Sequence, residues 1–139
     1  MARHNEIGEI GERITLNYLT RKGFDVICMN YRKKWGEIDV VAIKDNILHF
    51  VEVKTVSRSS VDGKIMDGKN DHRPEDNVHP MKARRLERAM QTYLLENYKK
   101  NDPEWQFDLA CVFLDKDKKV AKIKFMENIV LELILNPAV

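Results

Sequence analysis

The sequence predicts an α/β domain in which helices cover a mixed β-sheet and the elements follow the order αβββαββα. Apolar residues recur every three or four positions in two segments, as they do in helices that bury one face. Five shorter runs are rich in the apolar and β-branched residues typical of strands. At 139 residues the chain has room for one domain, which we expect to span residues 1–139.

The first half of this domain is expected to hold one helix and three strands. The helix spans residues 6–22 and ends at Gly23, after two basic residues. Its apolar face has members spaced by three or four positions: Ile7, Ile10, Ile14 and Tyr18. The strands follow over residues 24–29, 38–43 and 47–53. Because only a short polar link separates the last two strands, we expect them to form an antiparallel hairpin.

The second half begins with a long loop. Residues 57–79 are rich in Ser, Gly, Asp and Pro, and because compact domains seldom contain structureless loops of this length, we expect this loop to be mobile. A helix follows from Pro80, and its buried stripe has five members: Leu86, Ala89, Met90, Tyr93 and Leu94. Two strands over residues 105–114 and 120–125 and a short closing helix over residues 127–135 complete the domain.

The composition is that of a folded protein with a charged surface. Charged residues make up 33% of the chain and hydrophobic residues 43%, and the formal net charge is only +2, which excludes a uniformly basic tail but allows local basic patches. Cys28 and Cys111 lie in apolar runs, as buried thiols do in a reducing compartment, so we expect a cytoplasmic protein. No segment approaches the ~18 apolar residues of a membrane span, and we expect no membrane association.

Ionisable residues stand at one end of the predicted hairpin. With a two-residue turn, Asp39 faces Glu52 and Glu37 faces Lys54, with Cβ atoms ~4.5–5.5 Å apart. Alternation along the strand also places Glu52 and Lys54 on one face. Facing carboxylates repel each other unless a cation lies between them, and Mg²⁺ is a hard cation that prefers oxygen ligands. The pattern therefore indicates a divalent-metal site with a lysine beside it.

The same residue types also fit a solvated hairpin face with a cross-strand salt bridge. Apolar neighbours weigh against this alternative, because Leu48 and Phe50 share a strand face with Glu52 and Lys54, which places these charges at the end of a core face. The pairing depends on the turn, since a three-residue turn would send Asp39 to the opposite side of the hairpin.

At these residues the chain resembles a known family. Gly-Glu-Ile-Asp, a short hairpin and then Phe-Val-Glu-Val-Lys are similar to the YraN-like family of predicted endonucleases, distant relatives of the archaeal Holliday-junction resolvases in the PD-(D/E)xK nuclease superfamily. The resemblance continues on both sides of the hairpin, through Gly11-Glu12, Tyr18-Leu19, Gly23, Asn30-Tyr31-Arg32, Lys82, Tyr93-Leu94 and Phe107-Asp108. It implies a restriction-endonuclease-like core.

The resemblance also assigns roles to the ionisable residues. It implies four catalytic residues: Glu12, Asp39, Glu52 and Lys54. The two strand carboxylates, Asp39 and Glu52, would bind the metal together with the carbonyl of Val53, and Lys54 would handle the attacking water. The helix glutamate would complete the site, unless it is a plain exposed acid. Glu37 would be either an outer ligand or the salt-bridge partner of Lys54.

Basic residues before the hairpin and in the second helix are expected to contact nucleic acid. They are Arg32, Lys33, Lys34, Lys82 and Arg85. Such residues neutralise phosphates without reading bases, although charge runs of this kind also occur as plain solvated faces. The loop of residues 57–79 would act as a flap over the site, but it is longer and more acidic than the family pattern.

These features together predict a Mg²⁺- or Mn²⁺-dependent hydrolase that cuts the phosphodiester bonds of DNA, including branched or structured DNA. Resolving a junction would require two active sites and therefore a homodimer. Two alternatives remain open at this point: a non-catalytic nucleic-acid-binding or assembly factor on the same fold, and a nuclease that acts on RNA or on single strands.

Overall fold

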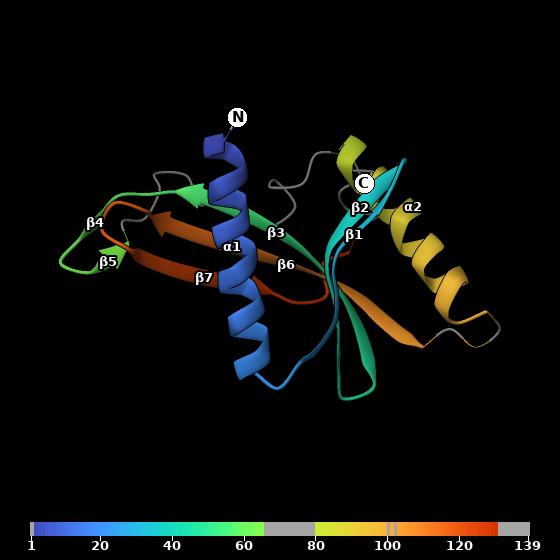
Figure 1. Cartoon of the computed structure of the whole chain (residues 1–139). Coiled ribbons are helices and arrows are strands. Elements are labelled where there is room, and N and C mark those ends of the chain that lie inside the picture. The colour runs from blue at the N-terminus through green and yellow to red at the C-terminus, as the bar shows by residue number, and fades with distance from the viewer. Residues whose placement is uncertain (1, 66–79, 100, 102, 131–139) are drawn as a thin grey trace.

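The computed structural model describes residues 2–65, 80–99, 101 and 103–130. Two helices and a five-stranded sheet make up most of this part of the chain, and a two-stranded hairpin is added to them (Figure 1). In chain order the elements are α1 (Ala2–Arg21), β1 (Asp25–Lys33), β2 (Gly36–Lys44), β3 (Ile47–Ser57), β4 (Ser60–Val61), β5 (Lys64–Ile65), α2 (Pro80–Asn97), β6 (Glu104–Asp115) and β7 (Val120–Met126).

The main sheet is mixed and has the strand order β1-β2-β3-β6-β7. β3 and β6 are parallel, whereas the other neighbouring strands are antiparallel. One core cluster joins apolar residues of the sheet to the buried stripe of α2, and a second cluster contains Leu19 of α1. The two helices therefore cover opposite faces of the sheet, with α1 crossing the face turned to the viewer in Figure 1. The predicted α/β class and mixed sheet are confirmed.

The hairpin of β2 and β3 has the predicted two-residue turn. Asp45 and Asn46 both have positive φ values, 52° and 63°, which matches a type I′ turn between twisted strands. Lys44 pairs with Ile47, and the same register continues to the pair of Val40 and Val51. The turn therefore directs the predicted carboxylates toward the same end of the hairpin.

Both helices lie close to the sheet at a glycine. A Cβ atom on Gly11 would lie 1.8 Å from Oγ1 of Thr55, so α1 packs directly on β3. A Cβ atom on Gly36 would lie 2.2 Å from the backbone oxygen of Arg85, so the start of β2 touches the backbone of α2. The buried stripe predicted for α2 is confirmed, since all its members are buried.

Two segments adopt another structure than the predicted one, and two predicted strands are longer than expected, with β1 running to Lys33 and β3 to Ser57. Residues 60–65, expected to be loop, form the hairpin of β4 and β5, and the backbone N–H and hydroxyl of buried Ser60 both donate to Asp115, at 2.9 and 2.8 Å. Residues 127–130 are not helical, because the N–H of Ile129 donates to the carbonyl of Phe107 and the N–H of Asn128 to the carboxylate of Asp108. Residues 66–79 and 131–135, where the rest of the predicted loop and closing helix fall, lie outside the described residues. None of the helices in the described part of the chain is long and apolar enough to cross a membrane.

Candidate metal and nucleic-acid site

The site is built around two buried carboxylates on neighbouring strands. Asp39 of β2 is 7% exposed and Glu52 of β3 is 3% exposed. The backbone N–H of Val53 donates to Oδ2 of Asp39 at 2.8 Å, which ties the Asp39 side chain to β3 beside Glu52. Burial, and then the negative charge of Glu52, raises the pKa of Asp39 from 3.8 to about 8. The protonated form of Asp39 is therefore favoured far more than in an ordinary aspartate.

The second carboxylate is only partly neutralised. Lys82 of α2 places its ammonium group against Oε2 of Glu52. Oε1 of Glu52 is buried and has no hydrogen-bond partner among the described residues. Since a buried carboxylate oxygen is costly to leave unpaired, this oxygen beside Asp39 fits a bound cation. The residues present are thus suited to a hard divalent ion, which is often held by only one or two carboxylates.

Lys54 and Val53 follow directly on β3. Lys54 lies two positions beyond Glu52, so its side chain leaves the same face of the strand, where it is exposed. Val53 is half-buried, and its N–H is the donor to Asp39. The ammonium group in contact with Glu52 belongs to Lys82 of α2, a contact that was not predicted from the sequence.

Glu37 has a different partner from the one expected. Its carboxylate pairs with Nε of Arg32 at 3.1 Å, across the two neighbouring strands β1 and β2. The ladder between β2 and β3 ends at Val40 and Val51, so the ladder does not hold Glu37 opposite Lys54. Of the two roles open for Glu37, outer ligand or salt-bridge partner of Lys54, the second is therefore replaced by a salt bridge with Arg32.

Glu12 of α1 lies near the strand carboxylates. It is half-buried and accepts a hydrogen bond from Nδ2 of Asn30 at 3.2 Å. Burial is the largest influence on Glu12 and raises its pKa, the hydrogen bond from Asn30 opposes that rise, and the charges of Asp39 and Glu37 add to it. Glu12 is thus within electrostatic reach of Asp39, and it is not a plain exposed acid.

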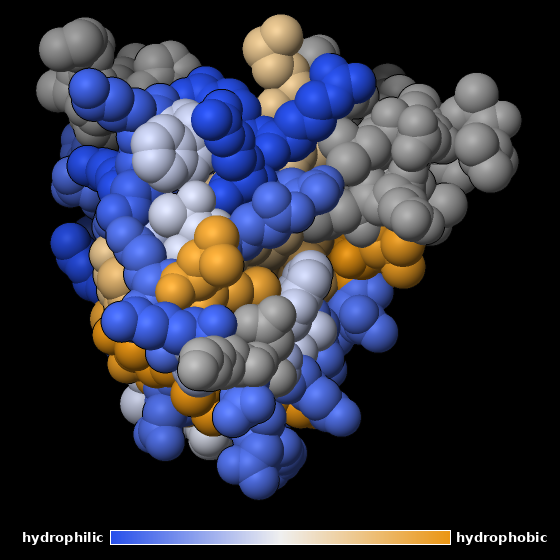
Figure 2. All heavy atoms as spheres, turned by 90° about the vertical axis from the view of Figure 1, so that its right-hand side faces the viewer, coloured by the Kyte–Doolittle hydropathy of each residue, from blue (hydrophilic) through white to orange (hydrophobic). Residues whose placement is uncertain are grey.

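Four of the five predicted nucleic-acid contacts line one groove of about 400 Å³ between α2 and the turn of the β1–β2 hairpin. These four are Arg32, Lys33, Lys82 and Arg85. Figure 2, seen from the side of α2, has hydrophilic residues gathered over the upper part of the molecule. Lys34 is exposed in the turn outside this groove. Trp35 packs on α2, where its Nε1 donates to Thr92 at 3.1 Å.

A second group of potential metal ligands was missed by the sequence analysis. Ligand atoms of His49, Asp108 and Glu127 lie within 4.8 Å of one another, so this group could hold a metal ion. His49 and Asp108 are buried and 2.5 Å apart, while the other Asp108 oxygen accepts from Gln106 and the N–H of Asn128. His49, a polar residue inside an apolar strand, was the feature of the sequence that could have indicated this group. Its partner Asp108 lies 59 positions away, so the pairing could not be read from local patterns.

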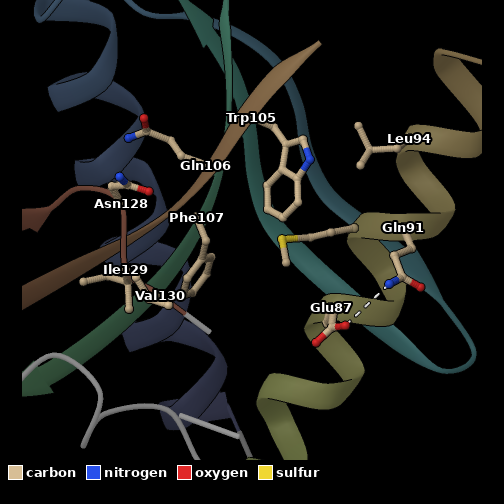
Figure 3. Close-up of a pocket in the computed structure, with 10 residues that line it drawn as sticks. Glu87, Gln91, Leu94, Trp105, Gln106, Phe107, Asn128, Ile129 and Val130 are labelled. Carbon is tan, nitrogen blue, oxygen red and sulfur yellow. Dashed lines mark hydrogen bonds between the residues drawn. The ribbon is translucent and has the colours of Figure 1, made fainter. Parts of the chain in front are cut away.

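An apolar pocket of about 370 Å³ lies between α2 and β6 (Figure 3). Met90, Leu94, Trp105 and Phe107 form much of its wall. Two of its polar groups, Glu87 and Gln91, bond to each other at 3.4 Å. None of the predicted site residues lines this pocket, so it is separate from the carboxylate pair.

Comparison with known proteins gives consistent matches. The sequence model of the uncharacterised protein family UPF0102 matches residues 11–112, a range that includes the carboxylates and Lys82. A UPF0102 protein of Flavobacterium psychrophilum is 37% identical over 128 residues, which cover 92% of this chain and 96% of that protein. One from Alkaliphilus metalliredigens is 41% identical over 118 residues, covering 82% and 90%. One from Campylobacter lari is 34% identical over 119 residues, covering 86% and 88%. These matches confirm the resemblance to the YraN-like family, and the chain belongs to the UPF0102 family.

Proposed function

We propose that this protein is a divalent-metal-dependent nuclease that hydrolyses phosphodiester bonds of DNA. The observation that carries the proposal is the buried pair of Asp39 and Glu52, in which one Glu52 oxygen has no partner among the described residues. Two adjacent buried carboxylates are costly in a purely structural role, because burial removes their hydration and the charge of one opposes ionisation of the other. A bound cation removes both costs.

Mg²⁺ or Mn²⁺ would be held by Asp39 and Glu52, with the carbonyl of Val53 as a third protein ligand and Glu12 nearby on α1. When bound, such an ion polarises a phosphate oxygen and favours the ionisation of a water molecule. Lys54, on the same strand face as Glu52, would orient the attacking water and stabilise the negative charge that develops on the phosphate. The groove lined by Arg32, Lys33, Lys82 and Arg85, here called the basic groove, lies beside the carboxylate pair. It would hold the phosphates that flank the scissile bond.

Lys82 gives the site a cation before any metal arrives. Its ammonium neutralises one oxygen of Glu52, and its place on the wall of the basic groove lets it turn toward a substrate phosphate. The same contact favours a second candidate function. If Lys82 remained on Glu52, the protein would be a non-catalytic nucleic-acid-binding or assembly factor on a nuclease fold.

One experiment separates these functions. Wild-type protein, Lys54→Ala and the control Lys99→Ala, which removes an exposed lysine beyond the end of α2, are incubated with Mg²⁺ or Mn²⁺. The substrates are duplex DNA, branched DNA, single-stranded DNA and RNA. We expect the wild type and the control to cut DNA, and Lys54→Ala to bind DNA without cutting it.

Other outcomes identify the alternatives. Binding without cleavage by the wild type, over all metals and substrates, would support the non-catalytic factor. Cleavage confined to RNA or to single strands would change the substrate class. Faster cleavage of branched DNA, together with a dimer in solution, would support a role on junctions.

A further inference from the structure

A strip of basic residues extends from β3 toward β7, at the edge of the sheet opposite the one beside the basic groove. It consists of Arg58, which follows β3, and Lys122 and Lys124 of β7, and it begins at Lys54. We propose that this basic strip binds the phosphate backbone of duplex DNA on the far side of the scissile bond from the groove. The proposal rests on the proposed function and adds the path of the substrate.

The strand pairing aligns these residues on one face. Cys111 of β6 pairs with Lys54 on one side and with Lys124 on the other. Burial raises the pKa of the Cys111 thiol, and the charges of Lys124 and Lys54 act against that rise, so both ammonium groups lie near this thiol. The three residues therefore form one rung that runs from the site to the edge of the sheet.

The next rung on the same face continues the strip. Phe113 of β6 pairs with Lys122 of β7, and the guanidinium of Arg58 lies 5.5 Å from the centre of the Phe113 ring. Cys111 and Phe113 belong to the core cluster that includes α2, so the strip and Lys82 lie on the same side of the sheet. Lys122 and Lys124 are exposed.

The carboxylate of Asp115, next to the strip, is already engaged in hydrogen bonds. Asp115 is the acidic residue of β6 on this face, and it accepts hydrogen bonds from Ser60 and from the N–H of Lys118. Lys54, Lys122 and Lys124 thus present positive charge on this exposed surface. A row of ammonium and guanidinium groups complements a phosphate backbone, which offers one negative charge at each step.

The sheet order places the site between two basic surfaces. The groove belongs to the β1–β2 side with α2, the carboxylate Glu52 lies on β3, and the strip occupies the β6–β7 side. Neighbouring strands are ~4.8 Å apart, so Lys54 and Lys124 are separated by two strand spacings, or ~10 Å. A substrate that touches both surfaces must extend in both directions from the scissile bond, which describes an internal bond of a long polynucleotide.

The test is the salt dependence of binding to a blunt duplex. The double variant Lys122→Gln/Lys124→Gln is compared with Lys22→Gln/Lys99→Gln, which removes the same charge from exposed positions outside the strip. Because each lost phosphate contact lowers the slope of log K against log [salt] by ~0.9, we expect the strip variant to lose ~1.8 units of slope and the control to keep the wild-type slope. Mn²⁺ binding and hydrolysis of bis(p-nitrophenyl) phosphate, a small diester that cannot reach the strip, should be unchanged.

The outcomes separate this proposal from the nuclease proposal. Equal slopes for the strip variant and the control would overturn the strip, even if both proteins cut DNA normally. A reduced slope with no cleavage by the wild type would support DNA binding by the strip and contradict the nuclease proposal. Loss of Mn²⁺ binding or of small-diester hydrolysis in the strip variant would also contradict the proposal, because these residues would then act at the metal site.

Discussion

Replacing Asp39 by Asn should change the pH dependence of stability in a defined direction. Asparagine keeps the size of the side chain and an oxygen that can accept the hydrogen bond from Val53, but it cannot ionise. In the folded protein the pKa of Asp39 is about 8, against 3.8 for an ordinary aspartate. At any pH between these two values, the wild type therefore releases a proton from Asp39 when it unfolds.

The size of the effect follows from this single proton. The stability that a raised pKa supplies is fully present when the pH is below the pKa of the unfolded state. It is lost as the pH rises through the pKa of the folded state. Within the window, the free energy of unfolding of the wild type falls by about 1.4 kcal/mol per pH unit because of Asp39. Between about pH 5 and about pH 7, Asp39→Asn should thus gain about 3 kcal/mol relative to the wild type.

Urea unfolding in the presence of EDTA, repeated across this pH range, measures the difference directly. Glu9→Gln, which removes an exposed carboxylate of α1, controls for the loss of one negative charge. The reasoning would be refuted by a constant difference between Asp39→Asn and the wild type from about pH 5 to about pH 7, since Asp39 would then be ionised in the folded protein.

Three further predictions concern the site and its support. Gly36→Ala should destabilise the protein by about 2–3 kcal/mol, because the new Cβ would meet the backbone oxygen of Arg85, and no rotamer change relieves that clash; denaturant unfolding measures it. Lys82→Met should tighten Mn²⁺ binding about two- to fivefold by calorimetry, since it removes the cation that competes for Glu52, and unchanged affinity would show that Lys82 does not occupy the metal position. Mn²⁺ affinity of the wild type should rise with pH by up to ~10-fold per unit until about pH 8, where Asp39 loses its proton. The Asp39→Asn variant should lose this pH dependence. If the variant kept it, the metal would bind at His49 and Asp108 instead.

Local patterns predicted the elements that carry the site. The polar link of Asp45 and Asn46 fixed a two-residue turn, and with it the register up to Val40 and Val51, the residues next to Asp39 and Glu52. Periodicity predicted the buried stripe of α2, because residues three or four positions apart share a helix face whatever they pack against. The closing helix failed over residues 127–130, where bonds from Asn128 and Ile129 to β6 replace helical ones.

The sequence by itself determined the two helices, the main strands and the hairpin with its carboxylates, because these depend on spacing within a few residues. Only the tertiary structure decided that Lys82 neutralises Glu52, that His49 meets Asp108, and that Cys111 lies between two lysines. Each of these contacts joins segments far apart in the chain, through the parallel pairing of β3 with β6 or the packing of α2 on the sheet. Periodicity records which face a residue occupies but not which distant segment covers that face, so packing alone settles these neighbours.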